Sequence, residues 1–111
     1  MSTPRRGIVV FGSTLATMVD AAEAADRAGF DAIWTSELYN RSATVTLAAI
    51  APRTSNAKIG SGIIYGVGRS PLMLAAEARD LDELSGGRLI LGIGNGTRRG
   101  TRGGDRTFRW W

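Results

Sequence analysis

The side chains best suited to acid–base chemistry in this chain are carboxylates and tyrosines, because the sequence contains no histidine and no cysteine. It therefore has no disulfide and no thiolate nucleophile, and it lacks the commonest general base and metal ligand. Glu37 follows an apolar run closely, and Tyr39 and Tyr65 also lie just after such runs. Proton transfer would need one of these groups, a bound cofactor or water. We assign no catalytic residue and predict no metal site, and we expect the two tyrosines to serve packing.

Glycines beside one asparagine mark a second kind of candidate site, at which a ligand can approach the backbone. Gly94, Asn95 and Gly96 end a continuous apolar run that begins at Leu89. Such a run is typical of a parallel strand that is covered on both faces, and glycine at its end permits close approach of another group. We therefore predict a fully buried strand over residues 89–94 and place Asn95 at the rim of the fold.

The elements that must position these residues alternate between strands and helices. Apolar runs predict strands over residues 7–11, 31–35, 58–64 and 89–94. Helical periodicity predicts helices over residues 15–28, 44–51 and 71–84, with capping residues before the first and third and glycine or proline after each. Right-handed crossovers would place all the strands in one parallel sheet, with Trp34 in the core.

This order of elements begins both open doubly wound sheets and closed (β/α)₈ barrels. The turn after the first predicted strand, FGST at residues 11–14, lacks the G-x-G-x-x-G spacing of a dinucleotide fold and the lysine of a P-loop. The turn therefore favours the barrel. At 111 residues and 43% hydrophobic content, the chain has the size and composition of one domain with a core.

The net charge of +4 comes entirely from the last residues of the chain. Nine basic and nine acidic residues precede residue 98, whereas Arg98–Trp111 holds five arginines and one aspartate. A basic segment that ends in tryptophans could contact phosphates and stack on bases, so nucleic-acid binding is an alternative function for this tail. No apolar run is long enough to span a membrane and no secretory signal is present, from which we expect a cytoplasmic protein.

Three segments in this order resemble the bacterial luciferase-like monooxygenase family, which includes reductases and dehydrogenases that use the deazaflavin F420. They are AGFDAIWTSE (Ala28–Glu37), KIGSGIIYGVGRSPLMLA (Lys58–Ala75) and LDELSGGRLILGIGNG (Leu81–Gly96). The LSGGRLxLGxG element is the most specific of the three. The resemblance implies a TIM barrel that holds FMN or F420 at the carboxyl ends of its strands and acts on a small organic substrate.

The resemblance also implies which residues contact the cofactor. They lie at the ends of four predicted strands: Phe11, Gly12, Glu37, Gly62, Ile63, Gly94, Asn95 and Gly96. Gly62-Ile63 matches the pair that often carries a non-proline cis peptide in the family. Leu38 stands where the family often has histidine, which favours hydride chemistry over chemistry that needs a histidine acid or base. Glu37 has two structural alternatives, capping of the next helix or an ion pair with Arg41.

The chain departs from the family pattern in its length and in its last residues. We expect residues 1–99 to form a (βα)₃β part of the (β/α)₈ barrel, and residues 100–111 to be a disordered tail outside the family. This pattern suggests a truncated or frameshifted product that is inactive by itself. A non-catalytic remnant, or a half-barrel that associates with itself as a homodimer, is the alternative to an oxidoreductase.

Overall fold

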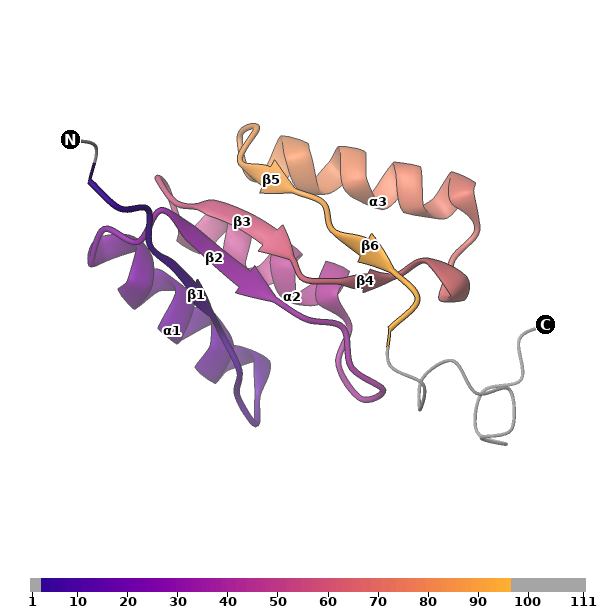
Figure 1. The fold of residues 1–111 in the computed structure, drawn as a ribbon, viewed down its shortest axis with the longest axis horizontal. Coiled ribbons are helices and arrows are strands. Elements are labelled where there is room, and N and C mark those ends of the chain that lie inside the picture. Colours follow the sequence, from indigo (N-terminus) through magenta and orange to yellow (C-terminus); the bar gives the residue numbers. More distant parts are fainter. Residues whose placement is uncertain (1–2, 97–111) are drawn as a thin grey trace.

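The computed structural model, which describes residues 3–96, has one principal parallel sheet with three α-helices along one face (Figure 1). The predicted tail, residues 100–111, lies outside the described part. Four strands pair in the order β1 (Gly7–Val9), β2 (Ala32–Thr35), β3 (Lys58–Ser61) and β5 (Leu89–Ile90). The intervening helices are α1 (Leu15–Arg27), α2 (Ala43–Ile50) and α3 (Pro71–Leu84). The predicted alternation of strands and helices is confirmed.

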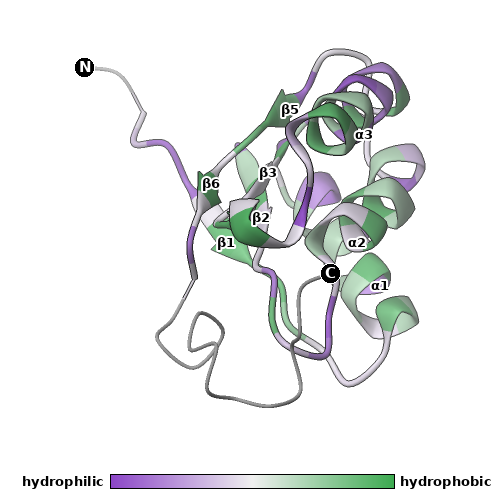
Figure 2. Cartoon of the chain, turned by 90° about the vertical axis from the view of Figure 1, so that its right-hand side faces the viewer, coloured by the Kyte–Doolittle hydropathy of each residue, from purple (hydrophilic) through white to green (hydrophobic). Residues whose placement is uncertain are grey.

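The order of the strands and the placement of the helices identify the architecture as part of a barrel. All three pairings in this sheet are parallel, and each strand lies beside the next principal strand along the chain. The helices stack on the same side of the sheet (Figure 2). A doubly wound sheet instead reverses its strand order and has helices on both faces. The predicted (βα)₃β unit of a (β/α)₈ barrel is therefore the observed fold.

Each of the three helices begins at a capping residue. The sequence predicts this residue for the first and third helices. Thr14, Ser42 and Ser70 are extended and accept hydrogen bonds from the backbone N–H three residues later, at 3.1, 3.3 and 3.2 Å. These bonds satisfy N–H groups that lack a partner within the helix. Pro71 occupies the first turn of α3, where the missing N–H carries no penalty.

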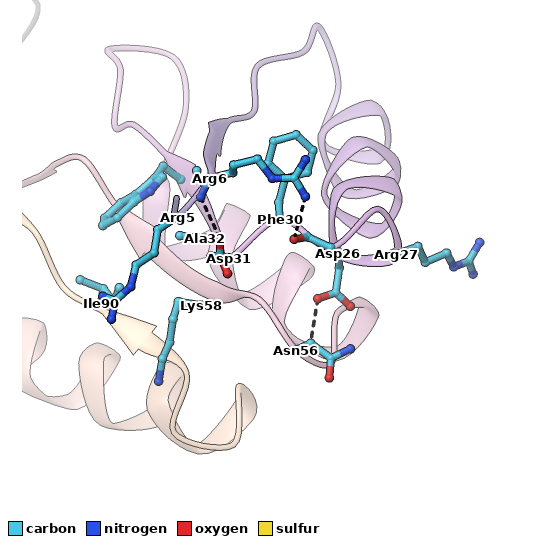
Figure 3. Close-up of a pocket in the computed structure, with 13 residues that line it drawn as sticks. Arg5, Arg6, Asp26, Arg27, Phe30, Asp31, Ala32, Asn56, Lys58 and Ile90 are labelled. Atoms are coloured by element: carbon cyan, nitrogen blue, oxygen red, sulfur yellow. Dashed lines mark hydrogen bonds between the residues drawn. The ribbon is translucent and has the colours of Figure 1, made fainter. Parts of the chain in front are cut away.

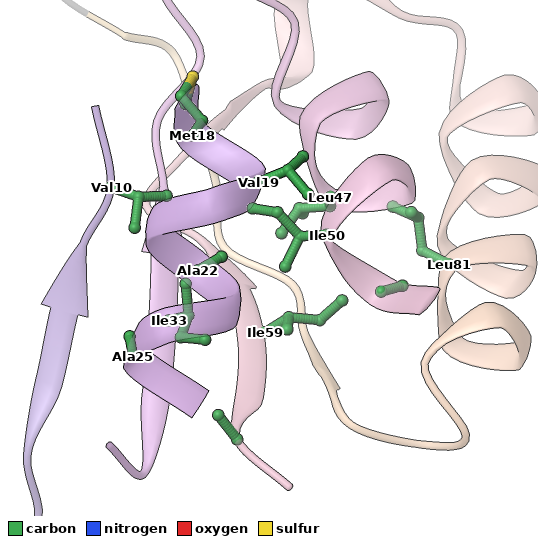
Figure 4. Packing of buried hydrophobic residues seen from close by; sticks show 12 residues of the cluster. Val10, Met18, Val19, Ala22, Ala25, Ile33, Leu47, Ile50, Ile59 and Leu81 are labelled. Carbon is green, nitrogen blue, oxygen red and sulfur yellow. The ribbon is translucent and has the colours of Figure 1, made fainter. Parts of the chain in front are cut away.

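The hydrophobic core lies between the sheet and the helices (Figure 4). Its fully buried aliphatic side chains come from β2, α2 and β3, and include Ile33, Leu47, Ile50 and Ile59. Helix α1 adds Met18 and Val19 together with Ala22 and Ala25, and the two alanines let it lie close to the strands. Helix α3 adds Leu81 as its single buried residue. The core is consequently densest around α2, and α3 is attached to it more sparsely.

Two predicted strands are wrong in extent, because each divides into two short strands. The runs at residues 58–64 and 89–94 form β3 and β5 and then β4 (Ile64–Tyr65) and β6 (Ile93–Gly94), which pair separately. Between them, the Ser61 hydroxyl donates to the Gly92 carbonyl and accepts from the Gly92 N–H, both at 2.9 Å. This side chain occupies backbone groups that a continuous ladder would use, so the four-stranded sheet ends there. Short 3₁₀ turns, Ala51–Arg53 and Gly66–Gly68, complete the connections.

Two predicted burials are also wrong, because the described residues leave the sheet face opposite the helices uncovered. Ile90 and Ile93 are 39% and 51% exposed, so the last strand is not fully buried. Trp34 is half-buried and lies on this open face rather than in the core. A Cβ built on Gly60 would come within 2.6 Å of the indole, so Gly60 makes room for it. In a complete barrel this face lines the interior.

A partly exposed junction between α1 and the loop before β3 gives the fold a predictable acid sensitivity. The Asp26 carboxylate accepts the backbone N–H groups of Ser55, Asn56 and Ala57 at 2.8, 3.0 and 2.7 Å. Burial by itself would raise the pKa of Asp26, but these donors and the nearby Arg88 charge hold that pKa below its usual range. Because the carboxylate is the form that these donors stabilise, folding favours ionised Asp26.

We expect the contribution of Asp26 to the free energy of unfolding to be constant well above its unfolded pKa, about 4, and to be lost as the pH falls from there through the lower folded pKa. Asp26→Asn should reduce this acid dependence and lower stability at neutral pH. Urea unfolding at pH 7, 4 and 3 measures both effects. Asp80→Asn, at an exposed position of α3, is the matched control. Equal pH dependence in wild type and Asp26→Asn would contradict this role.

Candidate functional site

A cavity of about 420 Å³ lies at the carboxyl end of the sheet, where β2, the β3–β4 segment and β6 end. It contains five of the eight predicted site residues. They come from three separate stretches of chain, and the cavity is lined by Ser36, Glu37, Leu38, Gly62, Ile63, Tyr65, Asn95 and Gly96. The carboxyl ends of parallel strands are where β/α folds bind ligands. This cavity is therefore the candidate site.

The Gly62-Ile63 peptide, which forms one wall, is cis, as predicted. Its carbonyl oxygen and the backbone groups on either side of it bond to the end of β2. The Gly62 N–H donates to the Thr35 carbonyl at 2.8 Å, the Ser36 hydroxyl donates to the Gly62 carbonyl at 2.6 Å, and the Glu37 N–H donates to the Ile63 carbonyl at 3.0 Å. A Cβ on Gly62 would have Trp34 as its nearest neighbour, at 4.0 Å. The peptide thus presents an open face, and its carbonyl oxygen already has a hydrogen-bond partner.

Phe11 and Gly12 lie beside this cavity rather than in it. They line a smaller hollow of about 160 Å³ with Ser13 and Met18, next to the end of β1. The two hollows share Ser36 and Leu38, so they adjoin. Phe11 is 63% exposed, which leaves its ring accessible to a ligand that spans both hollows.

Gly94 does not line the cavity but supports a residue that does. It pairs with Tyr65 between β4 and β6, and a Cβ at this position would lie 2.6 Å from Cδ1 of Ile63. Glycine here lets the Ile63 side chain settle against β6. The Tyr65 ring lies against Gly96 in the same way, consistent with the packing role expected for this tyrosine.

Glu37 is buried, and both of its carboxylate oxygens have two donors. One oxygen accepts the Tyr65 N–H at 3.0 Å and the other accepts the Ala43 N–H at 3.0 Å. The Arg69 guanidinium binds both oxygens, at 2.8 Å from Nη2 to Oε2. Burial would raise the pKa of Glu37, but Arg69 and the two N–H donors outweigh it and lower that pKa. Glu37 is therefore a carboxylate that binds the start of α2, the strand β4 and Arg69.

The two structural alternatives for Glu37 have different outcomes. The bond to Ala43 N–H confirms that it caps the next helix. The ion pair with Arg41 is wrong, because Arg41 donates to the Ser13 carbonyl at 3.1 Å and Arg69 takes its place. Sequence reasoning missed Arg69 because it is 32 residues away, in an irregular loop without periodicity. The available signal was that Arg69 lies in IIYGVGRSP, which belongs to one of the three segments that resemble the family.

A larger hollow, of about 850 Å³, lies at the opposite end of the sheet (Figure 3). Arg5, Arg6 and Lys58 line it together with Trp34 and Ile90 from the open sheet face. Arg6 already has partners there: its backbone N–H donates to the Asp31 carboxylate at 2.7 Å, and its guanidinium lies 5.2 Å from the centre of the Phe30 ring. This end holds the amino ends of the strands, where residues of β/α barrels serve stability rather than catalysis.

Two further properties bound the chemistry of residues 3–96. No three carboxylates in this range come together in a way that could hold a metal ion. No helix there combines the length and the apolar character that crossing a membrane requires.

Comparison with known proteins agrees with this geometry. The family model for luciferase-like monooxygenases matches residues 2–106, past the boundary predicted at residue 99. The 5,10-methylenetetrahydromethanopterin reductase of Methanolobus tindarius is 38% identical over 68% of this chain. The oxygenase component of the flavin-dependent trigonelline monooxygenase of Acinetobacter baylyi is 34% identical over 71% of it. The matched parts are 23% and 24% of those relatives, so the chain spans about a quarter of their length.

A solved structure gives the same result in three dimensions. The coenzyme F420-dependent tetrahydromethanopterin reductase of Methanopyrus kandleri superposes with a TM-score of 0.74 at 29% identity, over 85% of this chain and 27% of the reductase. From its sequence match and its fold, this chain belongs to the luciferase-like monooxygenase family.

Proposed function

We propose that the carboxyl-end cavity forms part of a site for the ring of F420 or FMN, in an oxidoreductase that acts on a small organic substrate. The observation that carries the proposal is the convergence of Gly62-Ile63, Asn95 and Gly96 on one cavity beside Glu37. Two relatives are named for F420 or flavin dependence, which supports this choice of cofactor.

The residues present fit such a group in size and chemistry. The volume of about 420 Å³ lies within the range of ligand pockets, roughly 300–1,000 Å³. Ile63 and Leu38 offer apolar surface to a flat ring, and the exposed Asn95 amide can donate or accept at its polar edge. The open face of Gly62 allows the ring to lie close to the backbone.

The protein residues in this proposal bind and orient rather than transfer protons. The bound cofactor supplies the hydride or the reducing electrons. Ile63 supports one face of the ring and excludes water from it. Glu37 stays ionised and holds the wall in place, because both of its oxygens are already occupied. The Leu38 side chain at the rim has no ionisable group. This favours hydride exchange with F420 over a reaction that needs an acid or base at that position.

Titration of the chain with F420 and with FMN, followed by the fluorescence of each, tests this proposal. We expect saturable binding of one of them. Asn95→Phe should fill the cavity and weaken this binding by at least about tenfold, since it displaces a ring that the wild-type site accommodates. Asn56→Phe, at the opposite end of the sheet, is the matched control and should bind as the wild type does. Equal affinity in all three proteins, or binding to none, would contradict the proposal.

The open sheet face supports a second candidate, self-association of a non-catalytic half-barrel. Val9 and Ile90 are 46% and 39% exposed on the open sheet face, and the edge of β1 has no partner strand among the described residues. Exposed apolar surface and free strand edges favour association. Sedimentation velocity distinguishes the candidates: a defined dimer that does not bind cofactor supports this one, and a monomer contradicts it.

A further inference from the structure

One guanidinium joins four elements at the carboxyl-end rim. Arg69 follows the 3₁₀ turn at Gly66–Gly68, and its side chain is only 14% exposed. It binds both oxygens of Glu37 at the end of β2, and its Nε donates to Glu77 of α3 at 2.9 Å. It also donates to the Tyr65 carbonyl at 3.3 Å and to the Thr44 hydroxyl at 3.4 Å. The loop is thereby connected to β2, β4, α2 and α3.

The geometry of this cluster requires the guanidinium of arginine, and another cationic side chain would not fit it. Two of its contacts are to one carboxylate through two different nitrogens, and a third nitrogen faces Glu77 from another direction. A planar guanidinium meets these demands together, whereas the compact ammonium of lysine cannot. One positive charge faces two carboxylates, of which Glu37 is the more buried at 8% exposure.

The cluster acts directly on the wall of the candidate site. Glu37 accepts the Tyr65 N–H, Arg69 donates to the Tyr65 carbonyl, and Tyr65 lines the cavity two residues after Ile63. Both backbone polar groups of Tyr65 are therefore held by the same ion pair. Loss of Arg69 would leave Glu37 buried with only its two N–H donors, which is costly for a carboxylate.

We infer that Arg69 is a positioning residue of the cofactor site, which holds β4 and the Gly62-Ile63 wall against the end of β2 through Glu37. Arg69 itself does not line the 420 Å³ cavity. Its effect on a bound ring is therefore indirect and passes through Tyr65 and Glu37. This inference rests on the proposed function, because the wall matters for activity only if the cofactor binds there.

Arg69→Lys tests the inference with two measurements, amide hydrogen exchange and cofactor titration. We expect exchange at Tyr65 and Ala43, whose N–H groups bind Glu37, to accelerate at least about tenfold, and the Kd for F420 or FMN to rise by a similar factor. Exchange at Val10, whose N–H bonds to the Trp34 carbonyl at 2.9 Å, should not change. Arg53→Lys, in an exposed ion pair with Glu23, is the matched control for both measurements.

The two measurements separate the inference from the proposed function. If the wild type binds neither cofactor, the proposed function fails, and exchange alone reports whether Arg69 holds β4. If exchange accelerates but the Kd stays at the wild-type value, Arg69 is structural and the inference is wrong. Unchanged exchange in Arg69→Lys also overturns it. If Arg69→Lys does not fold, Glu37→Gln, which keeps the shape of the cluster and removes one charge, serves for the same comparison.

Discussion

Gly92→Ala is expected to lower the free energy of unfolding by about 3 kcal/mol or more, because the added methyl group would overlap backbone atoms. A Cβ on Gly92 points directly at the Ser61 carbonyl oxygen, with the Ser61 carbonyl carbon next at 3.3 Å. Gly92 also accepts the Ile64 N–H at 2.8 Å, so it cannot move away without breaking the start of β4. Urea unfolding measures the loss.

Gly7→Ala is the matched control for this substitution, since it also places a methyl group on the sheet. There the nearest atom is Nε1 of Trp34 at 3.1 Å, a side-chain atom that can shift over the open face. We expect a change below about 1 kcal/mol for Gly7→Ala. Similar stabilities of the two variants would contradict the close approach of Ser61 and Gly92 that ends the four-stranded sheet.

Arg88→Lys is expected to destabilise the chain by about 2–4 kcal/mol through lost hydrogen bonds. The Arg88 guanidinium donates to the carbonyls of Ala51, Thr54, Ala57 and Ser85 and to the Thr54 hydroxyl, at 2.6–3.0 Å. All three nitrogens of the guanidinium donate hydrogen bonds. The single ammonium nitrogen of lysine cannot reach all of these acceptors at once. Several carbonyl groups would lose their partner.

Arg79→Lys, at an exposed position of α3, is the control for this effect and should be neutral within about 0.5 kcal/mol. Denaturation midpoints of the two variants against wild type make the comparison. A midpoint of Arg88→Lys at the wild-type value would show that the network adds nothing to stability.

The Arg88 network explains the most specific motif of the sequence in physical terms. In LSGGR, Ser85 ends α3 and accepts the Arg88 N–H at 3.2 Å, while Gly86 and Gly87 take φ values of +63° and +80°. Such values favour glycine over any residue with a Cβ. The turn then directs Arg88 into the loop before β3, at the end of the sheet away from the candidate site. The motif identifies the family through packing rather than through cofactor chemistry.

The elements themselves were predictable because they depend on local patterns. Apolar runs and capping residues predict each principal strand and helix to within a few residues. The breaks after Ser61 and before Ile93 were not predictable, because they arise from contacts between chain segments about thirty residues apart. The open-face position of Trp34 likewise depends on Gly60 across the neighbouring strand. Alternation within one strand does not say which of its two faces is covered.

The candidate site was predicted through the resemblance more than through the residues alone. Family motifs place Gly62, Ile63 and Asn95 at strand ends, and the structure brings them to one cavity. The same motifs predict Glu37 but not its partner, since a buried ion pair needs the three-dimensional proximity of Arg69. Charge and periodicity carry no such information across an irregular loop.

The most direct test of the proposed cofactor site is to map its amide groups by NMR while a cofactor binds. Spectra of the isotope-labelled chain, recorded during titration with F420 and with FMN, should shift at Gly12, Gly62, Ile63 and at residues 94–96. Signals at the opposite end of the sheet, from Arg6, Phe30 and Lys58, should stay in place. Shifts confined to that opposite end, or no shifts with either cofactor, would contradict a cofactor site at the carboxyl ends of the strands.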